Sequence, residues 1–232
     1  MKNHFTQAEV RYLVQTFVFE ENWHDLALLL VALDTALRAG DLLQLKVGDV
    51  CYSDGRFRRK LARRQQKTGK PVEPVLTPST QRSLARWIKI SGKTRDAYLF
   101  TRAKRSADAT PITRVHLSRL IKTWAGWLGH APDDYACHSL RRTKGVMMYD
   151  AGERVADISR MYGHSSEAST LHYLGITQRR VTEMCLRYDL GVEFNRSRHR
   201  RPVRTRPRAP TPIAQRDPEL FCAGAVSGGC GG

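Results

Sequence analysis

The sequence of 232 residues has no long apolar run, few acidic residues and no closely paired cysteines. The longest apolar run, residues 26–33, is far shorter than the ~20 residues of a membrane span. The N-terminus also lacks the charged and then apolar pattern of a signal peptide. These absences predict a soluble, cytoplasmic protein without a membrane partner. The five cysteines include no Cys-x-x-Cys pair, which argues against a disulfide framework and a structural zinc site and indicates a reducing compartment.

The motifs of several common enzyme classes are missing as well. The sequence contains no Gly-x-x-x-x-Gly-Lys, Gly-x-Gly-x-x-Gly, His-Glu-x-x-His or Gly-x-Ser-x-Gly. Nucleotide-driven enzymes, zinc metalloproteases and serine hydrolases therefore lose their usual support. A metal site made of His130, Cys137 and His138 has no fourth ligand at a recognised spacing. No metal and no cofactor are predicted.

Acidic residues are too few to balance the basic ones. The chain has 39 Lys and Arg against 22 Asp and Glu, which gives a formal net charge of +17. Such a surplus makes a polyanion, above all nucleic acid, the first partner to consider. Two stretches hold much of it. Residues 53–70 carry eight basic side chains against Asp54, and residues 195–232 carry eight arginines against two acids, a net of +6.

The two basic stretches differ in their predicted structure. The second lacks apolar periodicity and is rich in proline, so we expect a folded domain over residues 1–190 and a basic, disordered tail over residues 191–232. The first has turn signals at Asp54-Gly55 and Gly69 and is followed by the strand-like VEPVL. It predicts a hairpin or small antiparallel sheet whose turn projects basic side chains.

The remaining sequence is predicted to be mainly helical, so the expected class is α+β with one small sheet. Thr6 and Glu9 form a capping-box signal for a first helix. Further helices are expected over residues 117–128 and 155–162. A helix with one buried face is also expected after the first helix, as indicated by the spacing of Trp23, Leu26, Leu30, Leu33 and Leu37.

Polar residues interrupt these apolar helices at three places. Arg38 lies at the predicted end of the second helix, where it either pairs with Asp41 or serves the helix dipole. His138 and Arg141 are three residues apart and share one face of a helix, which suits a phosphate clamp beside a proton-transfer group. Each signal is weak when it is taken alone.

The third place follows a glycine. Gly163 predicts a helix stop that leaves His164 exposed in a turn. Ser165 or Ser166 is expected to cap a following helix with Tyr173 at its far end. Taken alone, Tyr173 is better explained as a half-buried packing residue than as a nucleophile.

Taken together and in this order, the segments resemble the catalytic domain of the tyrosine recombinase (phage integrase) family over about residues 5–190. TALRAGDLLQLKVGDV is similar to the first arginine box of that family, and HSLRRT and YGHSSEASTLHY are similar to its second box. Arg141 and His164 are 23 residues apart, and His164 and Tyr173 are 9 apart, as is typical of the family.

The resemblance implies a mechanism that these residue types support. Arg38 and Arg141 would bind the non-bridging oxygens of a phosphodiester and stabilise the transition state. Tyr173 would attack the phosphorus and form a covalent 3′-phosphotyrosyl link, so that neither ATP nor a metal is required. His138 would act as acid, base or phosphate ligand, and His164 would hydrogen-bond to the scissile phosphate.

In the family, a lysine in a turn between two strands protonates the leaving 5′-oxygen. Lys67 is the favoured candidate and Lys70 the alternative. Lys70, Arg63, Arg64 and Arg142 are expected to contact DNA. The implied partner is double-stranded DNA with paired recombination sites, bound by a homotetramer in a bacterial nucleoid or on a plasmid.

Some features depart from the family pattern. Few residues precede the first helix, so the chain resembles short recombinases without the N-terminal domain, or is a fragment, or uses its tail for the missing contacts. Arg142 stands where many members have His, and Tyr162 where Leu is common. The segment 177–190 resembles a helix that docks on a neighbouring subunit or on its own domain through Met184, Leu186 and Leu190.

Three functions remain open at this point. The leading one is a site-specific recombinase, whose outcome could be integration, excision, inversion or plasmid resolution. The second is a DNA-binding accessory protein of the same fold that cleaves nothing. The third is a relaxing enzyme related to type IB topoisomerases.

Overall fold

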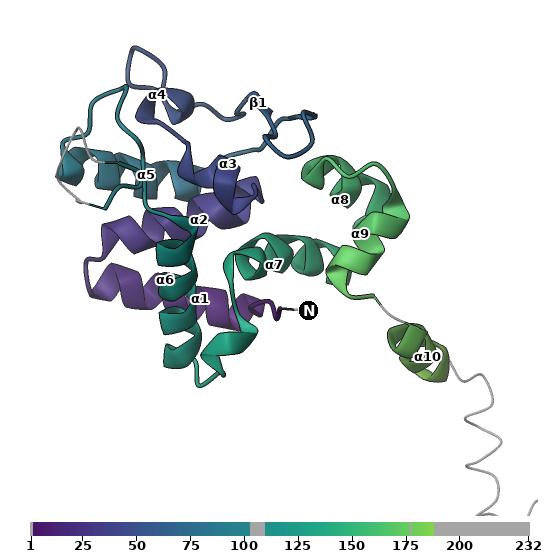
Figure 1. The fold of residues 1–232 in the computed structure, drawn as a ribbon. Helices are drawn as coiled ribbons and strands as arrows, with labels where there is room; N and C mark the ends of the chain where they lie inside the picture. The colour runs from purple at the N-terminus through teal and green to yellow at the C-terminus, as the bar shows by residue number, and fades with distance from the viewer. Residues whose placement is uncertain (1, 103–109, 177, 188–232) are drawn as a thin grey trace, which may run out of the picture. The chain divides into compact units, whose positions relative to one another are not determined.

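The computed structural model describes residues 2–102, 110–176 and 178–187. Met1–Met184 form one compact unit, and in the second unit, Cys185–Gly232, only Cys185–Arg187 are described. The described chain is mostly helical, which confirms the predicted class (Figure 1). Its helices are α1 (Gln7–Phe19), α2 (Trp23–Thr35), α3 (Ala39–Leu43), α4 (Val47–Val50), α5 (Pro78–Ser91), α6 (Arg114–Trp127), the 3-10 helix η1 (Pro132–Asp134), α7 (Cys137–Asp150), α8 (Val155–Tyr162), α9 (Glu167–Leu174) and α10 (Gln178–Arg187).

Helix starts follow the capping signals of the sequence. At the start of α1, the Thr6 hydroxyl accepts from the Glu9 N–H, and the Glu9 carboxylate accepts from the Thr6 N–H at 2.7 Å. This reciprocal capping box satisfies two donors that the first turn would otherwise leave unpaired. The Ser166 hydroxyl caps α9 by accepting from the N–H of Ser169. Of the two serines considered, Ser166 is therefore the cap.

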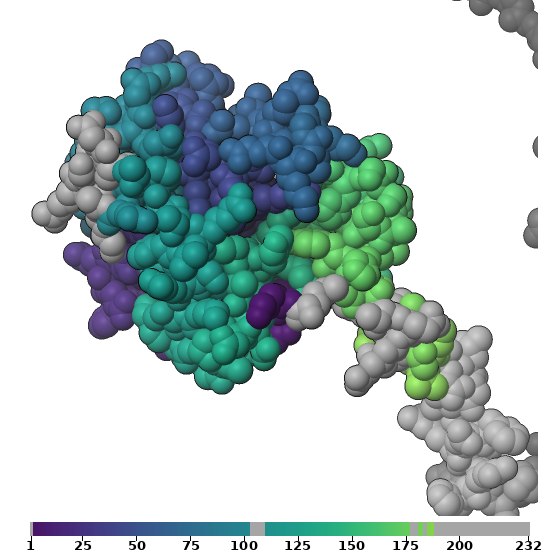
Figure 2. All heavy atoms as spheres, viewed as in Figure 1, coloured from purple at the N-terminus to yellow at the C-terminus, as the bar shows by residue number. Residues whose placement is uncertain are grey.

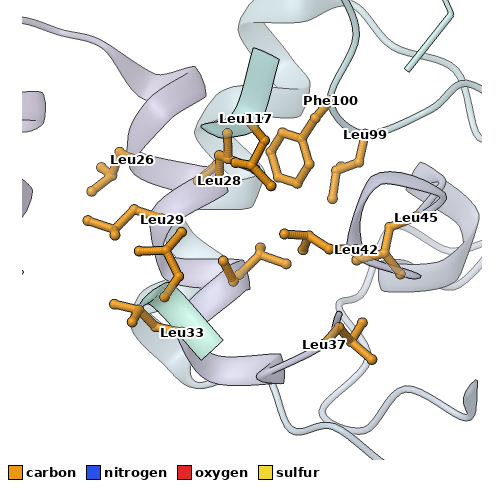
Figure 3. Packing of buried hydrophobic residues seen from close by; sticks show 14 of the residues in the cluster. Leu26, Leu28, Leu29, Leu33, Leu37, Leu42, Leu45, Leu99, Phe100 and Leu117 are labelled. Atoms are coloured by element: carbon orange, nitrogen blue, oxygen red, sulfur yellow. The ribbon is translucent and has the colours of Figure 1, made fainter. Parts of the chain in front are cut away.

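Helix α2 lies at the centre of the main core. The predicted stripe is too narrow, because Leu28 and Leu29 are fully buried while Leu30 is only half-buried. Helices α1, α5 and α7 all pack against α2, so nearly its whole circumference is covered. Figure 3 shows the leucines of α2 packed with Phe100 and Leu117 from other parts of the chain.

The basic stretch forms a hairpin, as predicted, but a very short one. Strands β1 (Arg63–Arg64) and β2 (Pro71–Val72) pair antiparallel, and Gly69 closes the turn with φ +65°. The expectation of a strand over VEPVL was wrong: beyond Val72, only an isolated bridge between Val75 and Lys60 continues the pairing. Proline at positions 71 and 74 has no N–H to donate, which limits a regular ladder here.

A second, smaller core holds the three helices that carry the conspicuous polar residues. Ala36, Val146, Ile158, Tyr162 and Leu174 are buried together and join the end of α2 to α7, α8 and α9. Residues 155–162 form α8 as predicted, and Gly163 ends it in the left-handed conformation at φ +67°. This cluster therefore fixes the positions of α7, α8 and α9 relative to the end of α2.

Helix α10 confirms that a helix follows Tyr173, and Val181 and Leu186 on it are exposed. The side chain of Met184, Leu190 and the tail all lie outside the described residues, so docking of this helix stays a prediction. Among the described residues, no helix is long and apolar enough to cross a membrane.

Candidate functional site

Arg38 lies in a turn between two helices. Helix α2 ends at Thr35 because Ala36 adopts a left-handed conformation, φ +46°, and Arg38 is the extended residue before α3. The prediction that Arg38 ends the long helix was therefore wrong by one turn. The expected pairing with Asp41 was also wrong: the Arg38 Nη1 donates to Gln65 Oε1, while Asp41 Oδ1 accepts from the Gln66 N–H at 3.0 Å.

Arg141 is the most enclosed cation of the site. It lies on the first turns of α7 and is 3% exposed. Its guanidinium donates to the carbonyl of Ala36 and, at 2.9 Å, to the carbonyl of Tyr162. Burial lowers the pKa of Arg141, yet a guanidinium keeps its charge in proteins. This buried, fixed charge is suited to binding an anion.

His138 projects from the same face of α7, one turn before Arg141, as the three-residue spacing predicts. Its side chain is exposed, and its ring centroid is 6.3 Å from that of Tyr173. Partial loss of hydration lowers the pKa of His138, and the charges of Arg141, Arg38 and Lys67 lower it further. The neutral imidazole is thus favoured in the free protein.

His164 follows Gly163 in the predicted turn but is half-buried there, so the prediction of an exposed side chain was wrong. Its ring stacks on Tyr162 with a centroid distance of 5.0 Å, and its Nδ1 pairs with Thr170 Oγ1 at 2.9 Å. Desolvation, with the charges of Arg141, Arg38 and Lys70, lowers the pKa of His164 to about 4. Thr170 therefore fixes the ring orientation of a neutral histidine.

Tyr173 lies near the end of α9, as predicted, among the residues just described. Its ring is edge-on to Tyr162 at 5.2 Å and to His164 at 5.5 Å, and the Arg141 guanidinium is 5.9 Å from its centroid. The hydroxyl is buried and has no well-formed hydrogen bond in the described part of the chain. Burial raises the pKa of Tyr173, and Arg141 is the largest influence opposing this rise.

Tyr162 packs against Arg141, His164 and Tyr173. It is fully buried, the Arg141 guanidinium lies 4.7 Å from its ring centroid, and its hydroxyl donates to the Arg141 carbonyl at 2.8 Å. A Cβ on Gly145 would clash with the Tyr162 hydroxyl, so α7 needs glycine at this point. The sequence marks Tyr162 only as a departure from the family's leucine and does not reveal this contact.

The two candidate lysines reach different parts of the site. Lys67 is exposed and lines a cleft of about 450 Å³ together with Arg38, Gln66, Arg114, Cys137 and His138. Lys70 is half-buried, and its charge contributes to the lowered pKa of His164. Figure 2 shows the hairpin, in blue, against the green segment of α8 and α9. The hairpin thus brings both lysines toward the arginines and histidines.

The three arginines expected to contact DNA already make contacts within the protein. Arg63 pairs with Asp49 at 2.5 Å, and Arg64 donates to the Gly69 carbonyl at 2.8 Å. Arg142 donates to the carbonyls of Lys2 and Leu174 and is half-buried. Arg64 remains exposed, whereas the other two are tied into the domain.

Several residues of the site were not singled out from the sequence. Gln65 and Thr170 hold Arg38 and His164 through hydrogen bonds between segments or helices, for which local sequence gives no signal. Arg114 lines the cleft from the first turn of α6. Within the described ranges, no cluster of three His, Cys, Asp or Glu side chains could hold a metal ion, and His130 pairs with Glu9 at 2.6 Å.

Comparison with known proteins gives consistent matches. The model of the phage integrase family matches residues 3–180. "Probable integrase/recombinase YoeC" of Bacillus subtilis (strain 168) is 27% identical over 165 residues, which cover 71% of this chain and 84% of YoeC.

Solved structures agree in fold. A crystal structure of XerA recombinase has a TM-score of 0.62 at 19% identity, covering 82% of this chain and 64% of XerA. XerH site-specific recombinase bound to its difH substrate has a TM-score of 0.59 at 16% identity, covering 79% and 53%. A lambda integrase dimer bound to a core site has a TM-score of 0.53 at 19% identity, covering 74% and 59%. This chain therefore spans roughly half to two thirds of each of these structures.

Proposed function

The chain belongs to the phage integrase family, and from this premise we propose that it is a site-specific recombinase that cuts and rejoins DNA through Tyr173. One observation carries the proposal. The hydroxyl of Tyr173 is buried, and its ring lies among Arg141, His164 and His138, three groups suited to binding and activating a phosphate. Arg141 also opposes the rise in the pKa of Tyr173 that burial causes, so the guanidinium favours the phenolate that attacks phosphorus.

The proposed reaction starts with attack of the Tyr173 oxygen on a backbone phosphorus. The P–O5′ bond breaks as the new P–O bond forms, so the number of phosphoester bonds is conserved and no external energy is needed. Arg38 and Arg141 bind the non-bridging oxygens, where negative charge grows in the transition state. Bound phosphate supplies an anion to the guanidinium of Arg141, whose hydrogen bonds within the described residues include the carbonyls of Ala36 and Tyr162.

Protons move at both ends of this displacement. The Tyr173 proton must leave as its oxygen attacks, and neutral His138 is placed to assist as a base or to bind the phosphate. The departing 5′-oxygen takes a proton from a hairpin lysine, for which Lys67 is favoured because it shares the cleft with Arg38 and His138. His164, held by Thr170, hydrogen-bonds to the phosphate. Rejoining reverses these steps with a new 5′-hydroxyl.

The proposal extends to the partners. Double-stranded DNA with paired sites is the substrate, with contacts from Lys70, Arg64 and, less accessibly, Arg63, whereas Arg142 is bound to two carbonyls of the domain. A tetramer on DNA would complete two paired exchanges, and α10 is the element proposed to dock on a neighbouring copy. A soluble, cytoplasmic protein at the nucleoid or on a plasmid fits this role.

The test is covalent capture of DNA. The substrates are duplexes that together cover the DNA flanking the gene, each with a nick near the centre of an inverted repeat. Cleavage next to the nick releases a short fragment that diffuses away, so the strand cannot be rejoined. We expect the wild-type protein to form an SDS-resistant adduct and Tyr173→Phe to bind the same duplex without one. Tyr149→Phe, in a tyrosine on α7 that the proposal does not use, is the matched control and keeps the adduct.

Other outcomes select the other functions. An adduct in the Tyr173→Phe variant would refute the assignment of the nucleophile. Specific binding with no adduct in the wild-type protein would favour the accessory protein. Relaxation of supercoiled plasmid by a monomer, without sequence preference, would favour the topoisomerase-like enzyme.

A further inference from the structure

Gln65 is a buried amide between the hairpin and the catalytic residues. It follows β1 directly, two residues before Lys67, and is 2% exposed. Its Oε1 accepts from Arg38 Nη1 and from Thr68 Oγ1, the latter at 2.8 Å, and its Nε2 donates to the Tyr162 carbonyl at 2.8 Å. Only one orientation of the amide satisfies all three partners, because the carbonyl of Tyr162 accepts and the Arg38 guanidinium only donates.

The Tyr162 carbonyl connects the two arginines. It accepts from Gln65 Nε2 at 2.8 Å and from Arg141 Nη2 at 2.9 Å. Arg38 is thus linked to Arg141 through one amide and one carbonyl, although the two arginines are far apart in the sequence. Two guanidiniums that bind one phosphate must be held at a fixed separation, and this chain of hydrogen bonds provides it.

The same amide sets the position of the hairpin. A Cβ on Gly163 would come within 2.9 Å of Gln65 Nε2 and of Val72 Cγ1, so the hairpin packs closely on the end of α8. The backbone of Gln65 also closes the turn, since its N–H donates to the Lys70 carbonyl and its carbonyl accepts from the Gly69 N–H. Lys67 and Lys70 project from this turn, and His164 follows Gly163.

We propose that Gln65 is a positioning residue that holds Arg38 in register with Arg141 and docks the lysine hairpin beside the His164 turn. The inference rests on the proposed function for its effect on cleavage, but the contact with Arg38 is testable without it. Gln65 does not touch the reacting atoms. It acts through Arg38, through the Tyr162 carbonyl and through the turn that carries Lys67.

The first experiment measures Arg38 directly in the free protein. The Nη1–Hη resonance of Arg38, which reports the donor to Gln65, is identified in a low-temperature nitrogen–proton spectrum by its loss in Arg38→Lys. We expect Gln65→Met, which has similar volume but no amide, to shift this resonance and to speed its exchange with water. Gln81→Met is the matched control. Gln81 lies on α5 and donates to the Leu76 carbonyl at 3.2 Å, so its substitution should leave the Arg38 resonance unchanged. An unshifted Arg38 resonance in Gln65→Met would overturn the proposal.

The second experiment measures cleavage of the nicked duplex under single-turnover conditions with saturating protein. We expect Gln65→Met to slow adduct formation at least about tenfold, because small misplacements of binding groups have effects of this size or larger. The dissociation constant for the same DNA should change by less than about threefold, since phosphate contacts along the duplex dominate affinity. Gln81→Met should change neither quantity.

A double variant separates positioning from general loss of stability. In the Arg38→Lys background the partner of Gln65 is already altered, so Gln65→Met should slow cleavage much less than in the wild-type protein. A slowing that is the same in both backgrounds would show that Gln65 does not act through Arg38 and would overturn the inference that it holds this arginine. If the wild-type protein forms no adduct, the proposed function fails, and the Arg38 resonance still decides the role of Gln65.

Discussion

His164 combines a half-buried ring with three neighbouring positive charges, and this predicts how stability depends on pH. Its pKa is about 4 in the folded protein, against 6.5 for the ordinary side chain. Between these values the unfolded chain binds a proton that the folded chain does not, so stability is complete above about pH 6.5 and decreases as the pH falls toward 4. The His164 contribution to this decrease is at most about 3 kcal/mol.

We therefore predict that His164→Gln makes the free energy of unfolding less dependent on pH. Between pH 7 and pH 5 the loss of stability should shrink by roughly 1–2 kcal/mol relative to the wild-type protein, as measured by urea unfolding. His172→Gln, in an exposed histidine on the same helix as Tyr173, is the control and should keep the wild-type slope. An unchanged slope in His164→Gln would show that its ring is not held neutral by its surroundings.

Single residues also show what the sequence can predict. The pairing of His138 with Arg141 on one face of α7, and the stop at Gly163, follow from local spacing and were predicted correctly. The position of Arg38 was not, because Ala36 adopts a left-handed conformation that is typical of glycine rather than alanine. The contacts of Gln65 join residues that are distant in sequence, and no local pattern encodes them.

At the scale of elements, the end of α9 depends on an arginine from α7. Arg142 donates to the Leu174 carbonyl at 2.9 Å and to the Lys2 carbonyl, so it joins the last turn of the helix that carries Tyr173 to the start of the domain. Hydrogen bonds from a charged donor are stronger than those from a neutral one. The Arg142 guanidinium therefore anchors the last turn of α9 to the N-terminal segment. The sequence instead suggests a DNA contact for the same residue.

Comparison of two arginine variants distinguishes these roles. We predict that Arg142→Met lowers the stability by about 2 kcal/mol, or the Tm by roughly 4–8 °C, and leaves the salt dependence of DNA binding unchanged. Arg64→Met, at an exposed hairpin residue, should leave the Tm almost unchanged and lower the slope of log K against log salt by about 1. A lowered slope with an unchanged Tm in Arg142→Met would return Arg142 to the DNA contacts.

At the scale of the whole molecule, the excess charge of +17 is unevenly divided. Residues 195–232 carry +6 of it, and the remaining +11 belongs to residues 1–194. The proposed catalytic residues all lie within residues 1–194. Binding strength and phosphodiester chemistry should therefore be separable by truncation, because counterion release depends on how many phosphates are neutralised and not on which residue neutralises them.

We predict that a chain ending at Phe194 binds DNA more weakly and with a flatter salt dependence, yet still forms the Tyr173 adduct. If each unit of tail charge neutralises one phosphate, the slope of log K against log salt falls in magnitude by up to about 5. A full-length variant with glutamine at the eight tail arginines should show the same flatter salt dependence if the charge of the tail causes it. A wild-type slope in this variant would show that the length of the tail causes it. Retained binding with loss of the adduct in the truncated chain would show that the tail acts in assembling the cleaving complex, because the chemistry of the folded domain would then depend on a segment that holds none of its catalytic residues.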